Sequence, residues 1–225
     1  MFRALMIAAL LCIGTGASAA TLTIGTKLHN NSFPFSPRPG ADRYQQVWDG
    51  SIFQRIGKVE ITSISFELSR WSRRAPMATF DLSFSTTGAG VDALNTDGTE
   101  AGFDSNLGAD TAHFNRTVFR GERIRHTLDF AGSFIFDPSF GNLILDMRIS
   151  NVGRYYSGPA IAATHRAGGL FSRSHNFGSG FEGYGAIATF EYNEISEVPL
   201  PASAAFLGFG ALALGFAARK RRKSA

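Results

Sequence analysis

Acidic and amide side chains gather in one glycine-rich stretch of the chain, residues 88–115. Hard oxygen ligands on a flexible loop suit Ca²⁺, and the aspartates that could ligate the ion are Asp92, Asp97, Asp104 and Asp110. However, residues 95–100 lack the acidic register of an EF-hand loop, and Asp, Asn and Gly are also the residues that solvated turns use. We therefore expect a plain surface loop and no cofactor, with a calcium site as the alternative.

Nucleophiles and metal ligands of other kinds are scarce. The five histidines share no metal-ligand spacing, and His126 falls on the apolar face of an expected strand, where a hydrogen-bonded core histidine is the simpler interpretation. Gly178-Ser179-Gly180 lacks the flanking spacing and the strand-to-helix setting that a strained catalytic serine requires. We expect no catalytic residues and no enzymatic activity. A secreted hydrolase, which needs a carboxylate pair facing a cleft, is the enzymatic alternative.

Aromatic side chains could do binding chemistry, because a flat ring can cover the apolar face of a sugar. The candidate glycan contacts are Trp71, Trp48, Tyr155, Tyr156 and Tyr184. Trp71 follows an expected strand and stands among Arg70, Arg73 and Arg74, a positive setting that would suit an acidic polysaccharide. The alternative is that Trp48 and Trp71 close the two ends of a hydrophobic core.

The composition is that of one folded globular domain with a β-rich core. Of the 225 residues, 44% are hydrophobic and 18% are charged, and the 21 phenylalanines far outnumber Trp and Tyr. Such aromatic and turn-forming content favours pleated sheets over a helix bundle. Without Arg3 and the basic residues 219–223, the 22 positive side chains fall to 16 against 18 acidic ones, a net charge of −2. The body is therefore not basic, and we expect no nucleic-acid partner.

Strict alternation of apolar and polar residues predicts half-buried strands along much of the body. The alternating segments are 63–68, 78–85, 123–130, 143–150 and 184–192. Shorter runs are 22–24, 45–53, 117–119 and 134–136, separated by Gly, Pro, Asn and Asp clusters. About eight to ten strands follow, with no helix needed.

Alternating strands with one dry face must pack sheet on sheet or close into a barrel. We therefore expect an all-β fold over residues 21–193, a single antiparallel β-sandwich resembling a jelly roll. Residues 194–197 would then form a short tether between this domain and the C-terminal segment.

The N-terminus has the three parts of a secretory signal peptide, residues 1–20. A positively charged start precedes residues 4–14, an uncharged apolar run too short to span a bilayer. The cleavage site would be marked by the small residues Ala17, Ala19 and Ala20. Cys12, the only cysteine, lies inside this segment, so the exported chain would hold neither a thiol nor a disulfide. We therefore expect signal peptidase as a partner.

The C-terminus predicts one transmembrane helix. Residues 198–218 carry no charge, and the 17 residues after Pro201 would reach about 26 Å as a helix, enough to span a bilayer with basic side chains snorkelling. The residues that would stop translocation are Arg219, Lys220, Arg221, Arg222 and Lys223. Because such a cluster remains cytoplasmic, the body should lie outside.

The last 28 residues, 198–225, also resemble a known class of sorting signal. The motif residues are Val198, Pro199, Leu200, Pro201 and Ala202. Followed by an apolar helix and a basic tail, they are similar to the VPLPA variant of the PEP-CTERM signals on surface proteins of Gram-negative bacteria. The resemblance implies that an exosortase, a protease or transpeptidase of the inner membrane with a catalytic cysteine, cuts near the prolines. Leu200 stands where the commoner motif has Glu.

The two prolines agree with that resemblance on physical grounds. Pro199 and Pro201 cannot continue a helix, and they favour the extended backbone that a protease binds. The alternative is that they only begin the membrane helix at the interface.

Three function classes follow. The favoured one is a non-enzymatic surface or extracellular-matrix protein, delivered by exosortase-type sorting and acting through structural or adhesive contacts. The second is a carbohydrate-binding module for exopolysaccharide, and the third is the secreted hydrolase. In each case the chain is exported, lies first on the periplasmic side of the inner membrane, and then reaches the cell surface or matrix.

Overall fold

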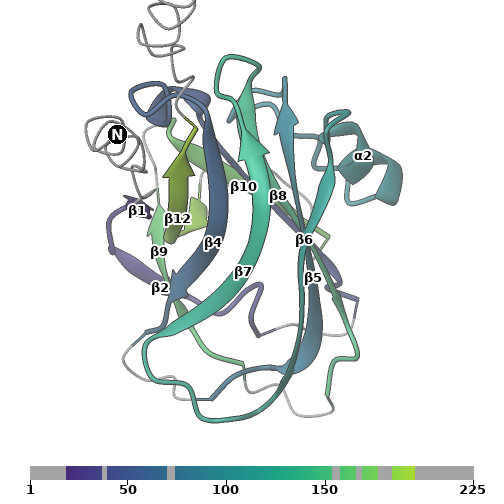
Figure 1. Ribbon diagram of the computed structural model, residues 1–225. Coiled ribbons are helices and arrows are strands. Elements are labelled where there is room, and N and C mark those ends of the chain that lie inside the picture. The colour runs from purple at the N-terminus through teal and green to yellow at the C-terminus, as the bar shows by residue number, and fades with distance from the viewer. Residues whose placement is uncertain are drawn as a thin grey trace, which may run out of the picture. The chain divides into compact units, whose positions relative to one another are not determined.

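The alternating segments of the sequence form strands in the computed structural model, which describes residues 19–36, 40–69, 74–153, 158–165, 169–176 and 184–195 (Figure 1). The longer strands are β4 (Val59–Glu67), β5 (Met77–Thr87), β6 (Ala112–Arg120), β7 (Thr127–Phe136) and β8 (Asn142–Ser150). The shorter strands are β1 (Ala20–Ile24), β2 (His29–Asn31), β3 (Arg43–Trp48), β9 (Ile161–His165), β10 (Phe171–His175), β11 (Tyr184–Ala186) and β12 (Ala188–Glu194). Within this part of the chain the helices are η2 (Gly50–Ile52) and α2 (Glu100–Ser105). The all-β class that the sequence predicts is confirmed.

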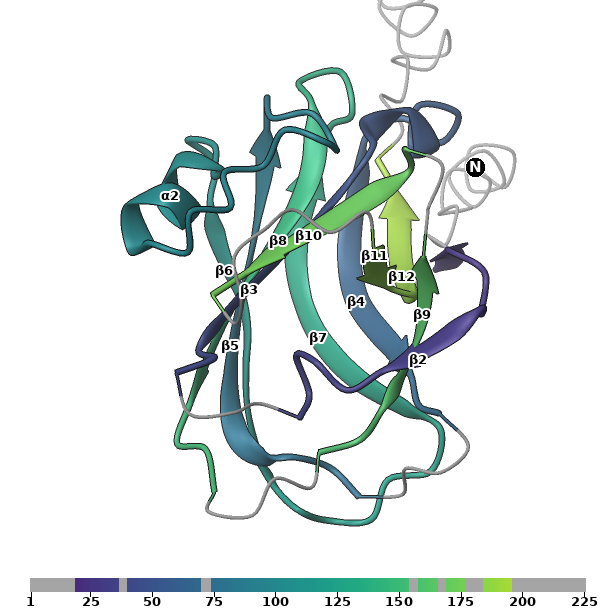
Figure 2. The same ribbon diagram turned by 180° about the vertical axis from the view of Figure 1, so that it is seen from behind.

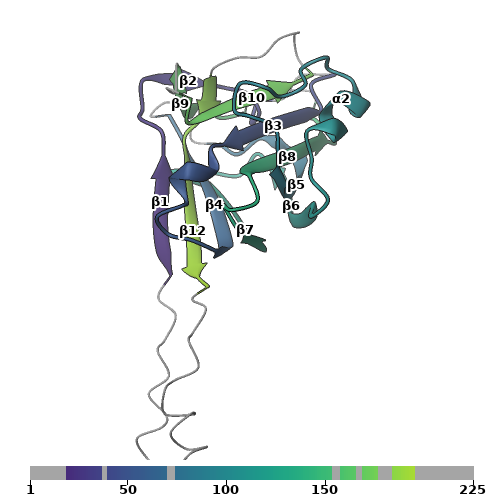
Figure 3. The same ribbon diagram turned by 90° about the horizontal axis from the view of Figure 1, so that it is seen from above.

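The described strands form two large antiparallel sheets and a smaller one. One large sheet has the order β1-β12-β4-β7, and the other has the order β10-β3-β8-β5-β6. The small sheet has the order β11-β9-β2. Figures 2 and 3 show the two large sheets lying face to face, so that their inner faces enclose the core.

The alternation in β5 is confirmed at the centre of the strand, where it distinguishes two faces, although Thr79 and Ser85 on the outer face are buried as well. Phe80, Leu82 and Phe84 are fully buried in the interior, whereas Asp81 and Ser83 between them are only half-buried. Side chains that alternate in this way place one face of the five-stranded sheet on the core.

The half-buried pattern expected for β8 is wrong on its outer face. Ile144 and Asp146 are buried as well, because the segment that carries α2 lies over this face (Figure 3). Leu94 and Leu107 of that segment pack with Ile144 in a second, smaller apolar cluster. Thr99 caps the N-terminus of α2, because its hydroxyl accepts a hydrogen bond from the N–H of Gly102 at 3.0 Å. The stretch expected to be a plain loop therefore contains a capped helix.

Two further expectations are corrected. The run 45–53 is a strand only as far as Trp48, because the Asp49 carboxylate accepts a hydrogen bond from the N–H of Ser51 at 2.7 Å and starts η2. His126 is exposed in the turn before β7 and is not a core histidine. The alternation of its neighbours continues into β7, but the strand begins one residue later, at Thr127.

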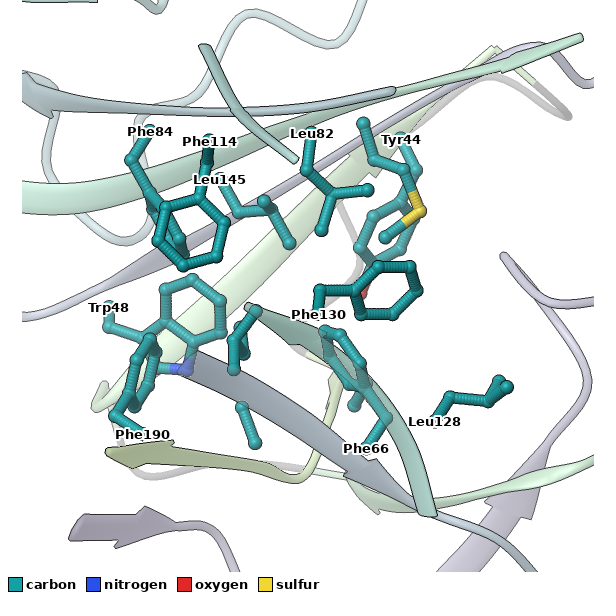
Figure 4. Packing of buried hydrophobic residues seen from close by; sticks show 14 of the residues in the cluster. Tyr44, Trp48, Phe66, Leu82, Phe84, Phe114, Leu128, Phe130, Leu145 and Phe190 are labelled. Atoms are coloured by element: carbon teal, nitrogen blue, oxygen red, sulfur yellow. The ribbon is translucent and has the colours of Figure 1, made fainter. Parts of the chain in front are cut away.

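The core consists largely of phenylalanine rings that interlock between the two large sheets (Figure 4). Trp48 of β3 meets Phe190 of β12 edge to face, with ring centroids 5.0 Å apart. Phe84 of β5 lies 5.7 Å from Phe134 of β7. Such ring pairs add about 0.5–1.5 kcal/mol beyond the burial of their area. The abundance of Phe is therefore explained by packing between the sheets.

Phe35 joins this core from outside the strands. It lies between β2 and β3 in the chain and is fully buried. Its ring centroid is 5.0 Å from that of Phe66, 5.4 Å from that of Phe80 and 5.9 Å from that of Phe130. One side chain therefore contacts both large sheets at once.

The first and last described strands are neighbours. Ala20 of β1 pairs with Tyr192 of β12, and Glu194 and Phe136 both pair with the same residue of β4. Thr127 starts β7 at the opposite end of the sheet, about 30 Å from Phe136 at ~3.4 Å per residue. In Figure 1, β12 accordingly ends at the top and the connection from β6 to β7 runs along the bottom.

Among the described residues, no helix has the length and apolar character needed to cross a bilayer. The expected transmembrane segment, residues 198–218, lies outside the described residues.

Replacing Phe35 tests its role between the sheets. We expect Phe35→Ala to lower the free energy of unfolding by about 3–5 kcal/mol, because the cavity it leaves borders rings of both sheets. Phe140→Ala is the matched control, since that ring is 77% exposed and its loss should change stability by less than about 0.5 kcal/mol. Urea unfolding followed by circular dichroism measures both, and equal effects would refute this role for Phe35.

Candidate binding surface

The candidate calcium aspartates do not converge on one site. Asp97 Oδ1 accepts hydrogen bonds from the backbone N–H and the hydroxyl of Thr99 at 2.8 and 2.7 Å. Asp110 Oδ1 accepts from the hydroxyl of Ser85 at 3.0 Å, and Asp92 is exposed. Among the described residues, no group of three or more acidic, Cys or His side chains is arranged to hold a metal ion. Asp97 therefore serves a turn of its own segment, and Asp110 holds that segment to the end of β5.

The fourth of these aspartates, Asp104, belongs to a charged cluster centred on Arg43. The Arg43 side chain is only 1% exposed and donates to Asp146 from Nε and Nη2 at 2.9 and 3.0 Å. It also donates to Glu100 and Asp104 at 2.7 Å each. Arg148 reaches Glu100 from the solvent side at 2.8 Å. Two guanidinium groups thus bind three carboxylates on the outer face of the five-stranded sheet.

The cluster shifts the ionisation of its members. Burial alone would lower the pKa of Arg43, but hydrogen bonds to Asp146 and Asp104 outweigh burial and raise it above the ordinary value. In return, the hydrogen bond from Arg43 and the charges of Arg43 and Arg148 hold the pKa of Asp104 below its usual range. Arg43 and Asp104 therefore stay charged at neutral pH.

Amide side chains extend this cluster to the segment that carries α2. Gln45 Nε2 donates to the carbonyl of Phe103 and to Asp146 Oδ1, each at 3.0 Å. Asn106 Nδ2 donates to Gln45 Oε1 at 2.8 Å, and its Oδ1 accepts from the N–H of Asn95 at 2.7 Å. The cluster therefore fastens this segment to the sheet. The one sign of this charged cluster in the sequence is Asp146, a carboxylate among apolar neighbours that needs a buried partner.

A second polar group faces the interior between β3, β10 and β11. The Tyr44 hydroxyl donates to Gln46 Oε1, which also accepts from the N–H of Ala186 at 2.9 Å. Burial raises the pKa of Tyr44 to about 12, although the charge of Arg173 opposes the shift. The Arg173 guanidinium lies over the Tyr184 ring, 4.5 Å from its centroid. Tyr44 therefore stays protonated and helps to position its neighbours.

The aromatic glycan candidates do not form an exposed strip in the described residues. Trp48 is fully buried in the core, so its assignment as a sugar contact is wrong and its role is packing. Tyr184 is half-buried beneath Arg173. Trp71, Tyr155 and Tyr156 lie outside the described residues.

Arginines instead gather where β5 begins and β6 ends. Pairing continues past the two strands, since the N–H of Ala75 donates to the carbonyl of Glu122 at 2.8 Å and Arg74 forms a bridge with Arg123. The exposed arginines of this surface, which we call the arginine end, are Arg74, Arg120, Arg123 and Arg125. The spacing of the last three, Arg-x-x-Arg-x-Arg, was visible in the sequence, but their proximity to Arg74 was not.

The arginine end carries unbalanced positive charge. No described carboxylate forms an ion pair with any of its four arginines, in contrast to Arg116 further along β6, which pairs with Asp81 at 3.1 Å. The nearest acid in sequence, Glu122, accepts a hydrogen bond from the backbone N–H of Arg120 at 2.7 Å. Arg74 and Arg123 stand directly opposite each other in the bridge, where like charges repel.

The sorting and membrane residues expected from the sequence lie outside the described residues, as does Ala17. Ala19 and Ala20 are described, and Ala20 is the first residue of β1.

Comparisons with known proteins add little. No protein family matches the sequence, and no curated protein matches it. Among solved structures, a chain in the structure of the infectious bursal disease virus Gt strain is similar over 82% of this chain and 38% of that chain, with 8% identity and a TM-score of 0.29. The VP2 subviral particle of the same virus is similar over 91% of this chain and 50% of its own, with 11% identity and a TM-score of 0.31. This chain thus spans at most half the length of these proteins, and the similarity supports no inference about its function.

The buried ion pair can be tested by one substitution. We expect Asp146→Asn to lower the free energy of unfolding by about 3 kcal/mol, because Arg43 stays buried with one partner weakened. The matched control is Asp81→Asn, whose pairs with Arg116 and His113 are exposed and should be worth less than about 1 kcal/mol. Urea unfolding measures both, and a loss at Asp146 no greater than at Asp81 would contradict a buried network.

Acid should release the α2 segment before the core unfolds. Because folding lowers the pKa of Asp104, its ion pairs stabilise the segment above the usual carboxyl pKa of 3.8 and are lost as pH falls through the lowered value. We expect pepsin to cleave near Phe103 faster at about pH 2 than at about pH 4, relative to an unstructured peptide of the same sequence. Asp104→Asn should be cleaved readily at both pH values, and undiminished protection of the original chain at pH 2 would disprove the mechanism.

Proposed function

We propose that this chain is an exported, non-enzymatic surface or matrix protein, delivered by exosortase-type sorting and acting through adhesive contacts of its β-sandwich. The observation that carries the proposal is the placement of the chain ends. β1 begins and β12 ends at the same end of the sandwich, since Ala20 pairs with Tyr192. A signal peptide and a sorting segment would thus attach at one end and leave the loops of the other end free for contacts.

The strand boundaries also suit removal of the signal peptide. Because β1 starts at Ala20, cleavage after Ala19 would leave the strand whole, and cleavage after Ala20 would remove a single paired residue. The first strand would then be formed by the new N-terminus of the exported chain.

The strand order supports the finer description of the fold as a jelly roll. The relevant strands, in chain order, are β1, β3, β4, β5, β6, β7, β8 and β12. One sheet holds the first, eighth, third and sixth of them, and the other holds the second, seventh, fourth and fifth. This interleaving is the arrangement of two Greek keys in a jelly roll, with β10 added beside the second strand.

A carbohydrate-binding module remains the second candidate. Its carrying feature is Trp71 among arginines in the sequence, and it predicts saturable retention on a polysaccharide column that Trp71→Ala abolishes.

The processing of the C-terminus tests the sorting proposal. Pro199→Ala with Pro201→Ala would let the helix continue outward and remove the extended recognition site while keeping the anchor. We expect mature protein from the native host to end near residues 198–203, and the double variant to accumulate uncut in the inner membrane. Mass spectrometry of the C-terminus measures this.

The chain offers a matched control at the same proline spacing. Pro37→Ala with Pro39→Ala changes a Pro-x-Pro sequence in the body and should leave processing unchanged. An intact C-terminus at Ala225 in the original chain as well as in the variant would show a permanent anchor instead.

A further inference from the structure

We propose that the arginine end binds an acidic polysaccharide, through the carboxylate or sulfate groups of its repeating units rather than through sugar faces. The inference deepens the proposed function, and it rests on that proposal because the proposal places the domain outside the cell. It names the surface, the chemical class of the partner and the basis of recognition.

The arginine end holds positive charges that no described carboxylate pairs. Arg43, buried in the same domain, is matched by three carboxylates, whereas Arg74, Arg120, Arg123 and Arg125 have no ion-paired carboxylate among the described residues. A guanidinium binds carboxylate or sulfate oxygens in a bidentate fashion. An anion placed between Arg74 and Arg123 would also offset the repulsion across their bridge.

The position of these arginines suits a long partner outside the cell. The β6–β7 connection lies at the end of the sandwich opposite to Glu194, where the chain leaves β12 (Figure 1). A polymer at this end would therefore be contacted away from the point where the sorting segment attaches. Because Arg74 and Arg123 oppose each other and exposed Arg120 and Arg125 lie close to Arg123 in the chain, a chain of repeated anions is bound better than a single small anion.

Other polyanions fit this surface less well. Single-stranded nucleic acids bind largely through aromatic side chains on which bases stack. Among the described residues, the large apolar side chains exposed at this end are Met77 and Val118, and the exposed Phe140 belongs to the opposite end. An anionic membrane would have to meet the arginine end, which lies at the end of the sandwich opposite to Glu194. The proposed anchoring segment follows Glu194 in the chain, so a membrane would be expected at the other end.

The binding experiment uses the full chain in nonionic detergent. Immobilised polygalacturonate tests carboxylates, dextran sulfate tests sulfates, and neutral dextran of similar length is the uncharged control. We expect binding to both acidic polymers, none to dextran, and an affinity that falls steeply as salt rises. Arg74→Gln with Arg123→Gln should weaken binding about tenfold at low salt, whereas Arg55→Gln, an exposed arginine at the other end, should leave it unchanged.

Thermal unfolding separates binding from folding. Without polymer, Arg123→Gln should match or exceed the original chain in melting temperature, because one of two opposed charges is gone. Polygalacturonate should raise the melting temperature of the original chain and of Arg55→Gln, but not that of the Arg74 and Arg123 double variant.

Several outcomes would overturn the inference. They are equal binding by the double variant and the original chain, equal binding of dextran, and tighter binding of single-stranded DNA or phosphatidylglycerol vesicles than of polygalacturonate. The C-terminal mass tests sorting independently. If the chain binds the polymer but its C-terminus is never cleaved, this inference stands and the sorting proposal fails. If the C-terminus is cleaved but the chain binds no polymer, the sorting proposal stands and this inference fails.

Discussion

The pairing of the first strand with the last is the constraint on which the rest of the structure depends. Because β1 adds to β12 at the edge of the four-stranded sheet, the chain must pass through both sheets before it returns to its starting point. The entry and exit of the domain then lie at one end, and the connection between β6 and β7 lies at the other. The separation of the attachment end from the arginine end follows from that pairing together with those of β12 with β4 and of β4 with β7.

Arginine residues have different roles at two places in this fold. Arg43 is buried beneath the α2 segment, where three carboxylates satisfy it and its loss would leave the buried charge of Asp146 without its partner. Arg74 and Arg123 are exposed, face each other across a bridge and have no described carboxylate to balance them. The first arrangement stabilises the fold through buried ion pairs, whereas the second gains only an exposed hydrogen bond from Arg74 to the carbonyl of Gly121 at 3.4 Å.

Local pattern predicted the strands well but could not predict what covers them. The alternation in β5 and β8 reports two faces, yet only the folded chain shows that the α2 segment buries Ile144 and Asp146. Trp48 reads equally well as a core residue or a sugar platform until β12 brings Phe190 against it. His126 sits at a strand boundary, the feature that periodicity locates least reliably. The errors at Trp48, Ile144 and Asp146 each concern a partner distant in sequence.

The arginine end is a further feature that the sequence alone could not predict. The positive neighbourhood of Trp71 was visible because its arginines are adjacent in sequence, but Arg123 joins Arg74 only through the pairing that continues β5 and β6. A sequence that specifies its fold at every level would not oppose two arginines across a bridge without a counter-charge. Local rules are broken in this way mostly at functional sites, where the cost to stability is offset elsewhere. In this domain the interlocked phenylalanine core supplies that offset, so a charged surface can be kept ready for a partner.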